Sequence, residues 1–416
     1  MCYNWVMTDN TRNNPKDNKA YDKIVVGAGA AGLFYAARDT SPGRKLILEK
    51  TSRPGQKLLM SGSGMCNITH GGSIKDFPAH YGPGGGRIRG CLYKHSNLEL
   101  MTFLEEGGIP LEEREDGKVF PASRRASDIL ELLLAKAASN GYELRCGCPA
   151  SDLKSLVSTL RGAPDSITGR LVIATGGASY PATGSDGTFF KIIKEELGIA
   201  VTELRPALAP VYVQDYRFAE LSGVSFPDAR LTCGEHETRG PLLLTHRGFS
   251  GPAALHISQY AKAGMTLHIG FLPDLNASLL LQKLRKDQPG SSIGLGNYLS
   301  REFSLPKAFV AALLKNPSRK FSSVSGDEIK SVADALTDMV CSISGTGGWR
   351  EAMVTAGGVS LKEVNLKNMS LTSYPHIQVI GEALDINGDT GGYNLQFAYS
   401  SARAANAKIE EILQLF

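Results

Sequence analysis

Short apolar segments alternate with segments of helical composition near the start of the chain. Lys23 to Val26 is an apolar, β-branched run, and residues 30–38 behind it have the composition of a helix. A second apolar run, "KLILEK", ends in Glu49 and Lys50. Strand, helix and strand in this order predict an α/β fold with a parallel sheet.

Further elements follow at regular intervals. We expect a helix near 98–105, extended pieces at 109–111 and 118–120, a helix capped by Ser127 and stopped by Gly141, and a strand at "YELRC". An apolar strand from Leu171 to Ala174 then runs into Thr175, Gly176 and Gly177. A buried parallel strand that ends in small residues marks a place where a ligand lies against the sheet edge.

The pattern changes between about 205 and 348. The strand-like pieces "APVYV", "ARLTC", "PLLLTH" and "MTLHIGF" are separated by turn residues, and helical patterns follow at 275–286, 306–314 and 327–339. We therefore expect an inserted substrate domain over 205–348, with a β-rich part at 205–272, either an antiparallel sheet or a small barrel, and a helical part at 273–340. The flanking halves, 21–204 and 349–416, would form the α/β domain.

The turn after the first strand carries six small residues, Gly27 to Gly32. In the pattern G-x-G-x-x-G, Gly27 permits the tight turn, Gly29 lets the backbone approach a pyrophosphate, and Gly32 lets the helix pack against the strand. The helix N-terminus supplies N–H groups for phosphates. Glu49 is placed to accept hydrogen bonds from an adenosine ribose; the alternative is a solvated carboxylate at the strand end.

The C-terminal residues repeat this organisation and extend the prediction from a dinucleotide to FAD. Ile377 to Ile380 is a strand, Gly381 to Gly392 a glycine-rich loop, and a helix runs from Tyr393 nearly to the end. A simple NAD dehydrogenase leaves this loop unexplained. The last helix would point its N–H groups at the flavin pyrimidine edge, and Asp385 would lie near the ribityl chain or the pyrophosphate. We expect NAD(P)H to bind transiently near the flavin, because no second strand-linked glycine motif is present.

Composition narrows the class without naming a substrate. The 416 residues are 42% hydrophobic and 21% charged, as in an ordinary globular protein, and the net charge of +4 permits a polyanionic partner without arguing strongly for one. Seven cysteines without a disulfide pattern favour a reducing compartment, so we expect a cytoplasmic protein. Residues 1–20 lack the apolar core of a signal peptide and are expected to be a disordered tail. We expect no membrane span, no metal site and no stable protein partner.

Cys66 lies in the glycine-rich stretch "SGSGMCNITH", which follows the second strand. We expect these glycines to let the backbone lie close to the flavin, with Cys66 near the ring. Two interpretations of the thiol stay open, namely packing or cofactor contact and a catalytic role. His246 in "THRGFSGP" is a second candidate acid, and its alternative is a hydrogen-bonded structural histidine.

Taken in order, the longer motifs resemble one family. They are "VVGAGAAGL", "LEKTSRPGQKLLMSGSGMCNIT", "IATGGASYPATGSDG", "LRPALAPV", "THRGFSGPAAL", "TAGGVSLKEV" and "GEALDINGDTGGYNLQFAYSSA". The chain is similar from about Tyr21 onward to the BaiN/RdsA-like (YhiN-like) FAD-dependent oxidoreductases. The resemblance implies a glutathione-reductase-type, Rossmann-like FAD domain in two halves, interrupted by barrel-like and helical insertions, with NAD(P)H as reductant. Family members are linked to reduction of a uridine in large-subunit ribosomal RNA and to bile-acid dehydroxylation.

The matching motifs also imply the residues that contact FAD. These are Gly27, Gly29, Ala30, Ala31, Gly32, Glu49, Lys50, Gln56, Lys57, Ser61, Gly62, Gly64, Cys66, Asn67, Thr175, Gly176, Gly177, Gly381, Glu382, Asp385, Gly391, Gly392, Tyr393, Asn394 and Leu395. Two positions depart from the family pattern. Met65 stands where a basic residue is usual and His70 where asparagine is usual. We therefore expect one charge contact near the flavin or substrate to be missing.

The predicted reaction is a two-step reduction. NAD(P)H reduces FAD and leaves, the flavin gives hydride to an electron-poor C=C bond, and a nearby acid, Cys66 or His246, protonates the neighbouring carbon. Uridine in ribosomal RNA would give dihydrouridine. The alternatives are a reductase or dehydrogenase for a small steroid-like or enone substrate, a flavin monooxygenase and a non-catalytic flavin-binding protein.

Overall fold

The computed structural model describes residues 20–163 and 166–406. Apart from Ala20, the tail predicted for residues 1–20 lies outside the described residues, and so does the end of the last predicted helix beyond Asn406. The chain divides into two compact units. Unit 1 combines the residues up to Arg205 with those from Val354 on, and unit 2 comprises Pro206–Met353.

Unit 1 is built on a seven-stranded sheet of order β18-β19-β20-β9-β1-β2-β6. The strands from β20 to β6 pair in parallel, and β19 and β18 extend the sheet beyond β20 by antiparallel pairing. The strands are β1 (Lys23–Val26), β2 (Lys45–Leu48), β6 (Tyr142–Arg145), β9 (Arg170–Ile173), β18 (Val364–Asn365), β19 (Ser370–Leu371) and β20 (Ile377–Val379). The apolar side chains of β1 and β9 are buried, which explains their continuous hydrophobic runs.

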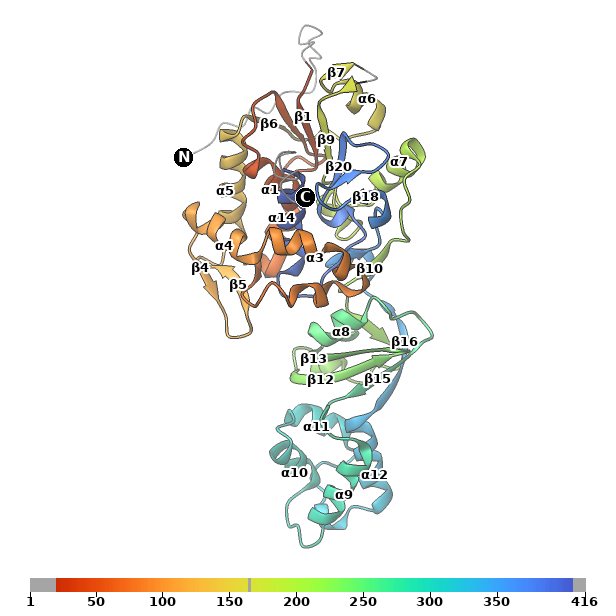
Figure 1. The fold of residues 1–416 in the computed structure, drawn as a ribbon. Helices are drawn as coiled ribbons and strands as arrows, with labels where there is room; N and C mark the ends of the chain where they lie inside the picture. The colour runs from red at the N-terminus through yellow and green to blue at the C-terminus, as the bar shows by residue number, and fades with distance from the viewer. Residues whose placement is uncertain (1–19, 164–165, 407–416) are drawn as a thin grey trace. The chain divides into compact units, whose positions relative to one another are not determined.

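Three helices pack together beside this sheet (Figure 1). Helix α1 (Ala30–Arg38) contacts both α5 (Ala126–Ser139) and α14 (Tyr393–Ala405). Phe34 and Tyr35 of α1 are fully buried, and Phe34 meets Tyr399 edge to face at 5.4 Å. The N-terminal and C-terminal sequence halves therefore share one hydrophobic core.

Shorter elements complete unit 1. A three-stranded sheet of order β3-β5-β4 follows the glycine-rich stretch around Cys66. The elements are α2 (Gln56–Met60), β3 (Thr69–His70), α3 (Gly85–Lys94), α4 (Asn97–Glu106), β4 (Leu111–Glu113), β5 (Lys118–Pro121), α6 (Leu153–Ser158), β7 (Gly162–Ala163), β8 (Ser166–Ile167), α7 (Thr188–Leu197) and β17 (Val354–Ala356), with β10 (Arg205–Ala207) at the boundary to unit 2.

Unit 2 contains a closed barrel of order β11-β14-β13-β12-β15-β16, together with helices. Its strands are β11 (Val211–Val213), β12 (Ser225–Cys233), β13 (His236–Leu244), β14 (Gly248–Ser250), β15 (Thr266–Gly270) and β16 (Met339–Thr346). Its helices are α8 (Gly251–Ile257), α9 (Ala277–Asp287), α10 (Leu295–Glu302), α11 (Lys307–Leu313), α12 (Gly326–Thr337) and α13 (Gly348–Glu351). The sixth strand, β16, follows the helical segment, so the chain leaves the barrel and returns to close it.

The predicted α/β class, with a Rossmann-type sheet and a small barrel, is confirmed. The predicted cap of α5 is wrong. The helix begins at Ala126 with Arg125 as its N-cap residue, and the Ser127 hydroxyl turns instead to the Asp128 carboxylate at 3.2 Å. No helix among the described residues has the length and apolar character that crossing a membrane requires.

The aromatic core of unit 2 gives a test of whether unit 1 holds the cofactor by itself. Phe309 is fully buried and contacts Phe218, Phe226 and Phe271 at centroid distances of 4.6–5.3 Å. We expect Phe309→Ala to lower the unfolding free energy of unit 2 by about 3–5 kcal/mol, because the substitution leaves a cavity. Flavin content after purification in the cold should stay at the wild-type level.

Urea unfolding followed by fluorescence, together with flavin absorbance per protein, checks this expectation. Leu279→Ala is the matched control, because Leu279 in the same unit is 50% exposed. Loss of flavin from Phe309→Ala in the cold, where the fold persists, would contradict the expectation.

Candidate functional site

The carboxyl edge of the parallel sheet is closed by glycine turns that leave no room for side chains. Gly27 has φ +106°, and a Cβ placed on it would lie 2.4 Å from the Ala174 carbonyl oxygen. A Cβ on Gly32 would lie 2.0 Å from the Gly27 carbonyl oxygen. These two glycines therefore let β1, β9 and α1 approach one another directly, as the motif predicts.

Gly29 differs from its neighbours because it faces open space. A Cβ there would have no heavy atom within 4 Å, and the residue has φ −81°, which any amino acid adopts. Gly29 is the N-cap of α1, so the first N–H groups of the helix, those of Ala30, Ala31 and Gly32, have no earlier turn to bond to. Open space before these amides fits a phosphate group.

Glu49 is held directly behind this turn. Its side chain is buried, and Oε2 accepts a hydrogen bond from the Ala28 N–H at 2.8 Å. Oε1 accepts from the N–H and the hydroxyl of Thr51, each at 2.8 Å. A carboxylate offers about four acceptor positions, so capacity for a further donor remains. The strand-end carboxylate is therefore a fixed part of the turn.

Two other residues predicted to contact the cofactor have partners at the surface. Lys50, the residue after Glu49, is ion-paired with Asp186. The amide of Gln56 at the start of α2 reaches the Arg53 carbonyl at 3.5 Å.

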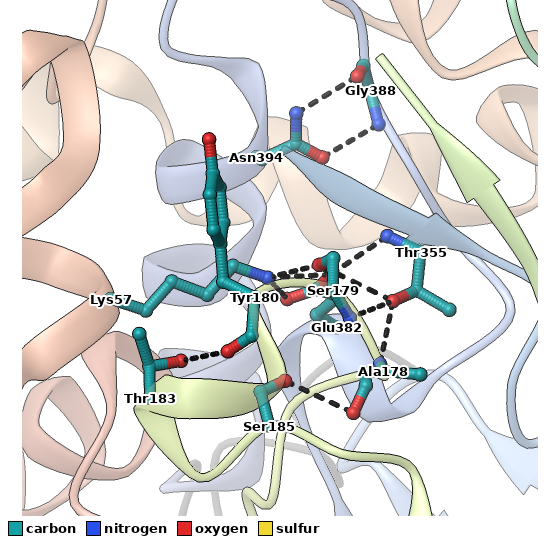
Figure 2. A network of polar contacts seen from close by, with 11 residues as sticks. Lys57, Ala178, Ser179, Tyr180, Thr183, Ser185, Thr355, Glu382, Gly388 and Asn394 are labelled. Carbon is teal, nitrogen blue, oxygen red and sulfur yellow. Dashed lines mark hydrogen bonds and ion pairs between the residues drawn. The ribbon is translucent and has the colours of Figure 1, made fainter. Parts of the chain in front are cut away.

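A polar network joins α2 to the C-terminal loop (Figure 2). Lys57 forms an ion pair with Glu382, with Nζ to Oε2 at 2.7 Å, and donates to the Ser179 hydroxyl at 2.5 Å. Glu382 also accepts from the Ser179 hydroxyl at 3.0 Å and from the Thr355 N–H at 2.8 Å. The Thr355 hydroxyl accepts from the backbone N–H groups of Ala178 and Ser179 at 2.7 and 3.2 Å.

This network unites two predicted residues, Lys57 and Glu382, with two that sequence reasoning missed. Ser179 follows the predicted Gly176 and Gly177, and Thr355 begins the quoted motif "TAGGVSL". Both residues lie in motifs that carry the family resemblance, and their place in these motifs was the one feature of the sequence that could have identified them. Because 325 residues separate Lys57 from Glu382, spacing along the chain did not reveal the contact.

The glycines of the two later turns pack onto the same region. A Cβ on Gly177 would lie 2.1 Å from the Thr355 hydroxyl, and one on Gly381 would lie 2.6 Å from the Ala31 Cβ. Gly381 therefore brings the C-terminal loop against the start of α1. Thr175 and Gly176 lie in the turn between β9 and this network, and Asp385 is half-buried further along the loop.

The start of α14 forms a second cluster. Gly391 and Gly392 have φ +119° and +95°. When the Asn67 amide is oriented so that both its oxygen and its nitrogen have hydrogen-bond partners, the oxygen accepts from the Gly392 N–H at 3.1 Å. The Asn394 side chain accepts from the Gly388 N–H and donates to the Gly388 carbonyl, each at 2.8 Å (Figure 2). The glycine loop is thus fixed to the helix that follows it. Leu395, next in this helix, is partly buried.

Tyr393, the first residue of α14, lies between two histidines. Its ring is nearly parallel to that of His80, at 4.0 Å, and to that of His70, at 5.6 Å. Burial, assisted by the nearby charge of Asp389, raises the pKa of Tyr393 to about 12. His70, which departs from the family pattern, therefore packs at the start of this helix.

Cys66 follows a turn in left-handed conformations. Gly62, Ser63 and Gly64 have φ +55°, +57° and +85°, and Cys66 itself has φ +61°. Its thiol is fully buried in the core of unit 1. Burial raises the pKa of Cys66 to about 11, although a hydrogen bond with Ser61 acts in the opposite direction. The thiol therefore keeps its proton at neutral pH.

His246 lies in unit 2, in the exposed turn between β13 and β14. Cys66 belongs to unit 1, so the two candidate acids lie in different units. Among the described residues, no group of three or more His, Cys, Asp or Glu side chains has the arrangement of a metal site.

Comparisons with known proteins agree with this geometry. The family described as HI0933-like protein Rossmann domain matches residues 21–408. The ribosomal RNA dihydrouridine synthase of Escherichia coli (strain K12) is 32% identical over 402 residues, covering 92% of this chain and 96% of that protein. The protein of the same name from Haemophilus influenzae is 31% identical over 93% of this chain and 98% of its own length.

A third relative has another substrate in its name. The 3-dehydro-bile acid delta(4,6)-reductase of Clostridium scindens is 26% identical, covering 93% of this chain and 98% of that protein. Among solved structures, a 3-ketosteroid-delta4-(5alpha)-dehydrogenase from Rhodococcus jostii RHA1 is 14% identical, with a TM-score of 0.47, over 94% of this chain and 97% of that chain.

The contrast between Gly29 and its neighbours predicts separable effects on folding and on cofactor binding. We expect Gly29→Val to fold normally, because its Cβ position has open space around it, and to retain little or no FAD. Gly32→Val should fail to fold stably, since its Cβ meets backbone at 2.0 Å. Circular dichroism, thermal unfolding of the apoprotein and FAD titration measure both effects.

Gly90→Val is the matched control for Gly29→Val, because Gly90 in α3 also has open space around its Cβ position. It should keep both its fold and its FAD. A yellow Gly29→Val protein with wild-type FAD affinity would remove the open turn from the cofactor site.

The Thr355 hydroxyl predicts a second measurable effect. Thr355→Val preserves the shape of the side chain and leaves the buried Ala178 and Ser179 N–H groups without this acceptor, which should cost about 1–3 kcal/mol of unfolding free energy. Thr355→Ser, which keeps the hydroxyl, should lose less. Urea unfolding of both apoproteins makes the comparison, and a smaller loss in Thr355→Val than in Thr355→Ser would contradict this role.

Proposed function

Because the chain belongs to the HI0933-like family of Rossmann-fold, FAD-dependent oxidoreductases, we propose that it reduces a uridine of large-subunit ribosomal RNA to dihydrouridine with electrons from NAD(P)H. The observation that carries the proposal is the match to two ribosomal RNA dihydrouridine synthases over more than nine-tenths of the chain. An RNA substrate also agrees with the mildly basic net charge of +4.

The residues at the sheet edge fit FAD. The open space at Gly29, facing the first amides of α1, would take the pyrophosphate, and Glu49 would take the adenosine ribose. The loop from Gly381 to Gly392 would hold the ribityl chain and the ring. When bound, FAD supplies hydride transfer from the reduced nicotinamide to an electron-poor C=C bond.

The protein has two tasks in this reaction. The N-terminus of α14 carries a partial positive charge that would stabilise negative charge on the pyrimidine edge of the cofactor, and the Asn394–Gly388 pair holds the preceding loop in place. The second task is to protonate the carbon next to the one that receives hydride. We propose Cys66 for this step, because burial keeps its thiol protonated.

A second candidate function is the reduction of a steroid-like enone. It is favoured by the relative named as a bile acid reductase, which is 26% identical over 93% of this chain. Both substrates contain a C=C bond conjugated to a carbonyl group, so the same hydride and proton donors serve either. The two substrates differ in size, because RNA is a large polymer and the enone a small molecule. They also differ in charge, because only RNA carries phosphates.

Analysis of ribosomal RNA nucleosides in cells that lack the gene tests the proposal. Dihydrouridine in large-subunit RNA should be lost and should return with the wild-type gene, whereas a gene with Gly29→Val should not restore it. The Gly90→Val gene should restore it and serves as the control. Unchanged dihydrouridine in the deletion strain, together with turnover of a steroid-like enone by the purified protein, would favour the second function.

Substitution of Cys66 separates proton donation from packing. Cys66→Ala should leave FAD content and flavin reduction by NAD(P)H intact while it slows product formation per bound FAD by a factor of about 100–10,000. Rapid-mixing measurements of the two half-reactions give both rates. Equal product formation in the two proteins, or loss of FAD from the variant, would assign Cys66 to packing.

The pH dependence of the wild-type protein gives an independent check. A proton donor works only while it is protonated, and the raised pKa of about 11 keeps the Cys66 thiol protonated below pH 10. The rate of product formation from reduced enzyme should therefore stay level from pH 7 to about 9.5. With an uncharged enone as substrate, which does not titrate in this range as the uracil N3–H does, a fall centred near the ordinary thiol value of 9.0 would contradict the assignment.

A further inference from the structure

The hairpin of β4 and β5, which has no part in the proposed reaction so far, lies against the turn that carries Cys66. Strand β5 pairs with β3 at Thr69 and Val119, and the Ile68 N–H donates to the Val119 carbonyl at 2.9 Å. A Cβ on Gly62 would lie 3.3 Å from Cε1 of Phe120 in β5. The small sheet β3-β5-β4 therefore continues directly from the segment that carries Cys66.

Arg114 stands at the tip of this hairpin with its guanidinium in a defined place. The guanidinium carbon lies 4.0 Å from the centroid of the Phe120 ring, and Nη2 donates to the Met65 sulfur at 3.7 Å. Phe120 is only 3% exposed, so the ring beneath the guanidinium is rigidly packed. The stacked cation thus touches the residue next to Cys66.

Arg114 forms no ion pair with any described residue, whereas its basic neighbours are ion-paired. Its charge does act on nearby Asp116, because the pKa of that carboxyl group is lowered by a hydrogen bond from Lys118 and, in addition, by the charge of Arg114. Lys118 in the same hairpin is ion-paired with Asp116, and Arg124 is ion-paired with Glu112 at 3.2 Å. The Glu113 side chain reaches Gly71, where a Cβ would lie 2.1 Å from its carboxyl carbon. A guanidinium stacked through its flat face keeps in-plane N–H donors for an anion, and the thioether of Met65 is a weak acceptor.

The turn beside Arg114 is strained, and its residues Gly62 and Ser63 are exposed, whereas the Cys66 side chain is buried. Ser63 and Cys66 adopt left-handed conformations that side chains other than glycine rarely take, and such residues gather at ligand sites. Leu59 and Met60, at the end of the preceding helix, are 38% and 48% exposed. A nucleotide presents a phosphate and a flat base, which are bound by a cation and by apolar contacts. Arg114 supplies a cation without an ion pair, and the segment that precedes the turn supplies exposed apolar side chains.

We propose that Arg114 binds a phosphate of the RNA next to the uridine that is reduced, and so positions that base at the Cys66 turn. This inference rests on the proposed RNA substrate. A planar guanidinium offers two parallel donors to two phosphate oxygens, an arrangement that lysine does not reproduce. Arg114 is thus a substrate-binding residue that favours a nucleotide over an uncharged enone.

Binding measurements without NAD(P)H test this role apart from turnover. The probe is an unmodified transcript of large-subunit ribosomal RNA, and the proteins are FAD-loaded wild type, Arg114→Gln, Arg114→Lys and Arg124→Gln. We expect Arg114→Gln to bind at least about tenfold more weakly, as the loss of one charged hydrogen-bonded contact implies. The slope of log affinity against log salt should fall by about 0.7.

The other variants and substrates identify the cause. Arg114→Lys should recover the salt slope and only part of the affinity, because it keeps the charge without the paired donors. Arg124→Gln removes the same charge from an ion-paired arginine and should bind as wild type does. With Arg114→Gln, KM for the RNA should rise more than kcat falls, while turnover of an uncharged enone and FAD content stay unchanged.

Three results would overturn the inference. Wild-type RNA affinity and salt slope in Arg114→Gln would show that no phosphate is bound there, and loss of FAD would assign the arginine to the cofactor. A raised KM for a carboxylate-bearing enone without any change toward RNA would assign it to a small acid. A wild-type protein that neither binds nor reduces the RNA would instead contradict the proposed function itself.

Discussion

The direct contact between the start of α1 and the ends of β1 and β9 determines the geometry of unit 1. Gly32 lies so close to the Gly27 carbonyl that a Cβ would stand 2.0 Å from it, and Gly27 has the same relation to Ala174 at 2.4 Å. Because backbone meets backbone here, the helix cannot shift relative to the sheet. Its first amides are therefore held at the sheet edge, and Glu49 fixes the turn from behind by accepting from Ala28.

The C-terminal half of the chain completes this arrangement from the other side. Gly381 approaches Ala31 closely, and Glu382, the next residue, forms the ion pair with Lys57. Both charged side chains are roughly a quarter exposed, so the pair contributes more through the geometry it imposes than through Coulomb energy. Residues more than 300 positions apart are thereby joined, so both sequence halves contribute to unit 1.

The sequence predicted local elements well because their signals are local. The strand at Lys23–Val26 and the helix at Ala30–Arg38 have the predicted bounds, since apolar runs and the glycine turn mark both ends. It did not predict β16, whose polar alternation follows a helix. It also wrongly placed the cap of α5 at Ser127, because the helix starts earlier, with Arg125 as its N-cap residue. The contacts of Ser179, Thr355 and Arg114 were also missed, because they join separate segments of the chain, which periodicity and spacing do not encode.

We propose that this flavoprotein reduces uridine in ribosomal RNA. The most direct measurement reduces the purified protein with NAD(P)H in the absence of oxygen, mixes it with an unmodified large-subunit transcript, and analyses the nucleosides by mass spectrometry. If the protein reduces uridine, one uridine gains the mass of two hydrogen atoms as the flavin becomes oxidised. A flavin that stays reduced with the transcript, yet is oxidised at once by a steroid-like enone, would contradict it.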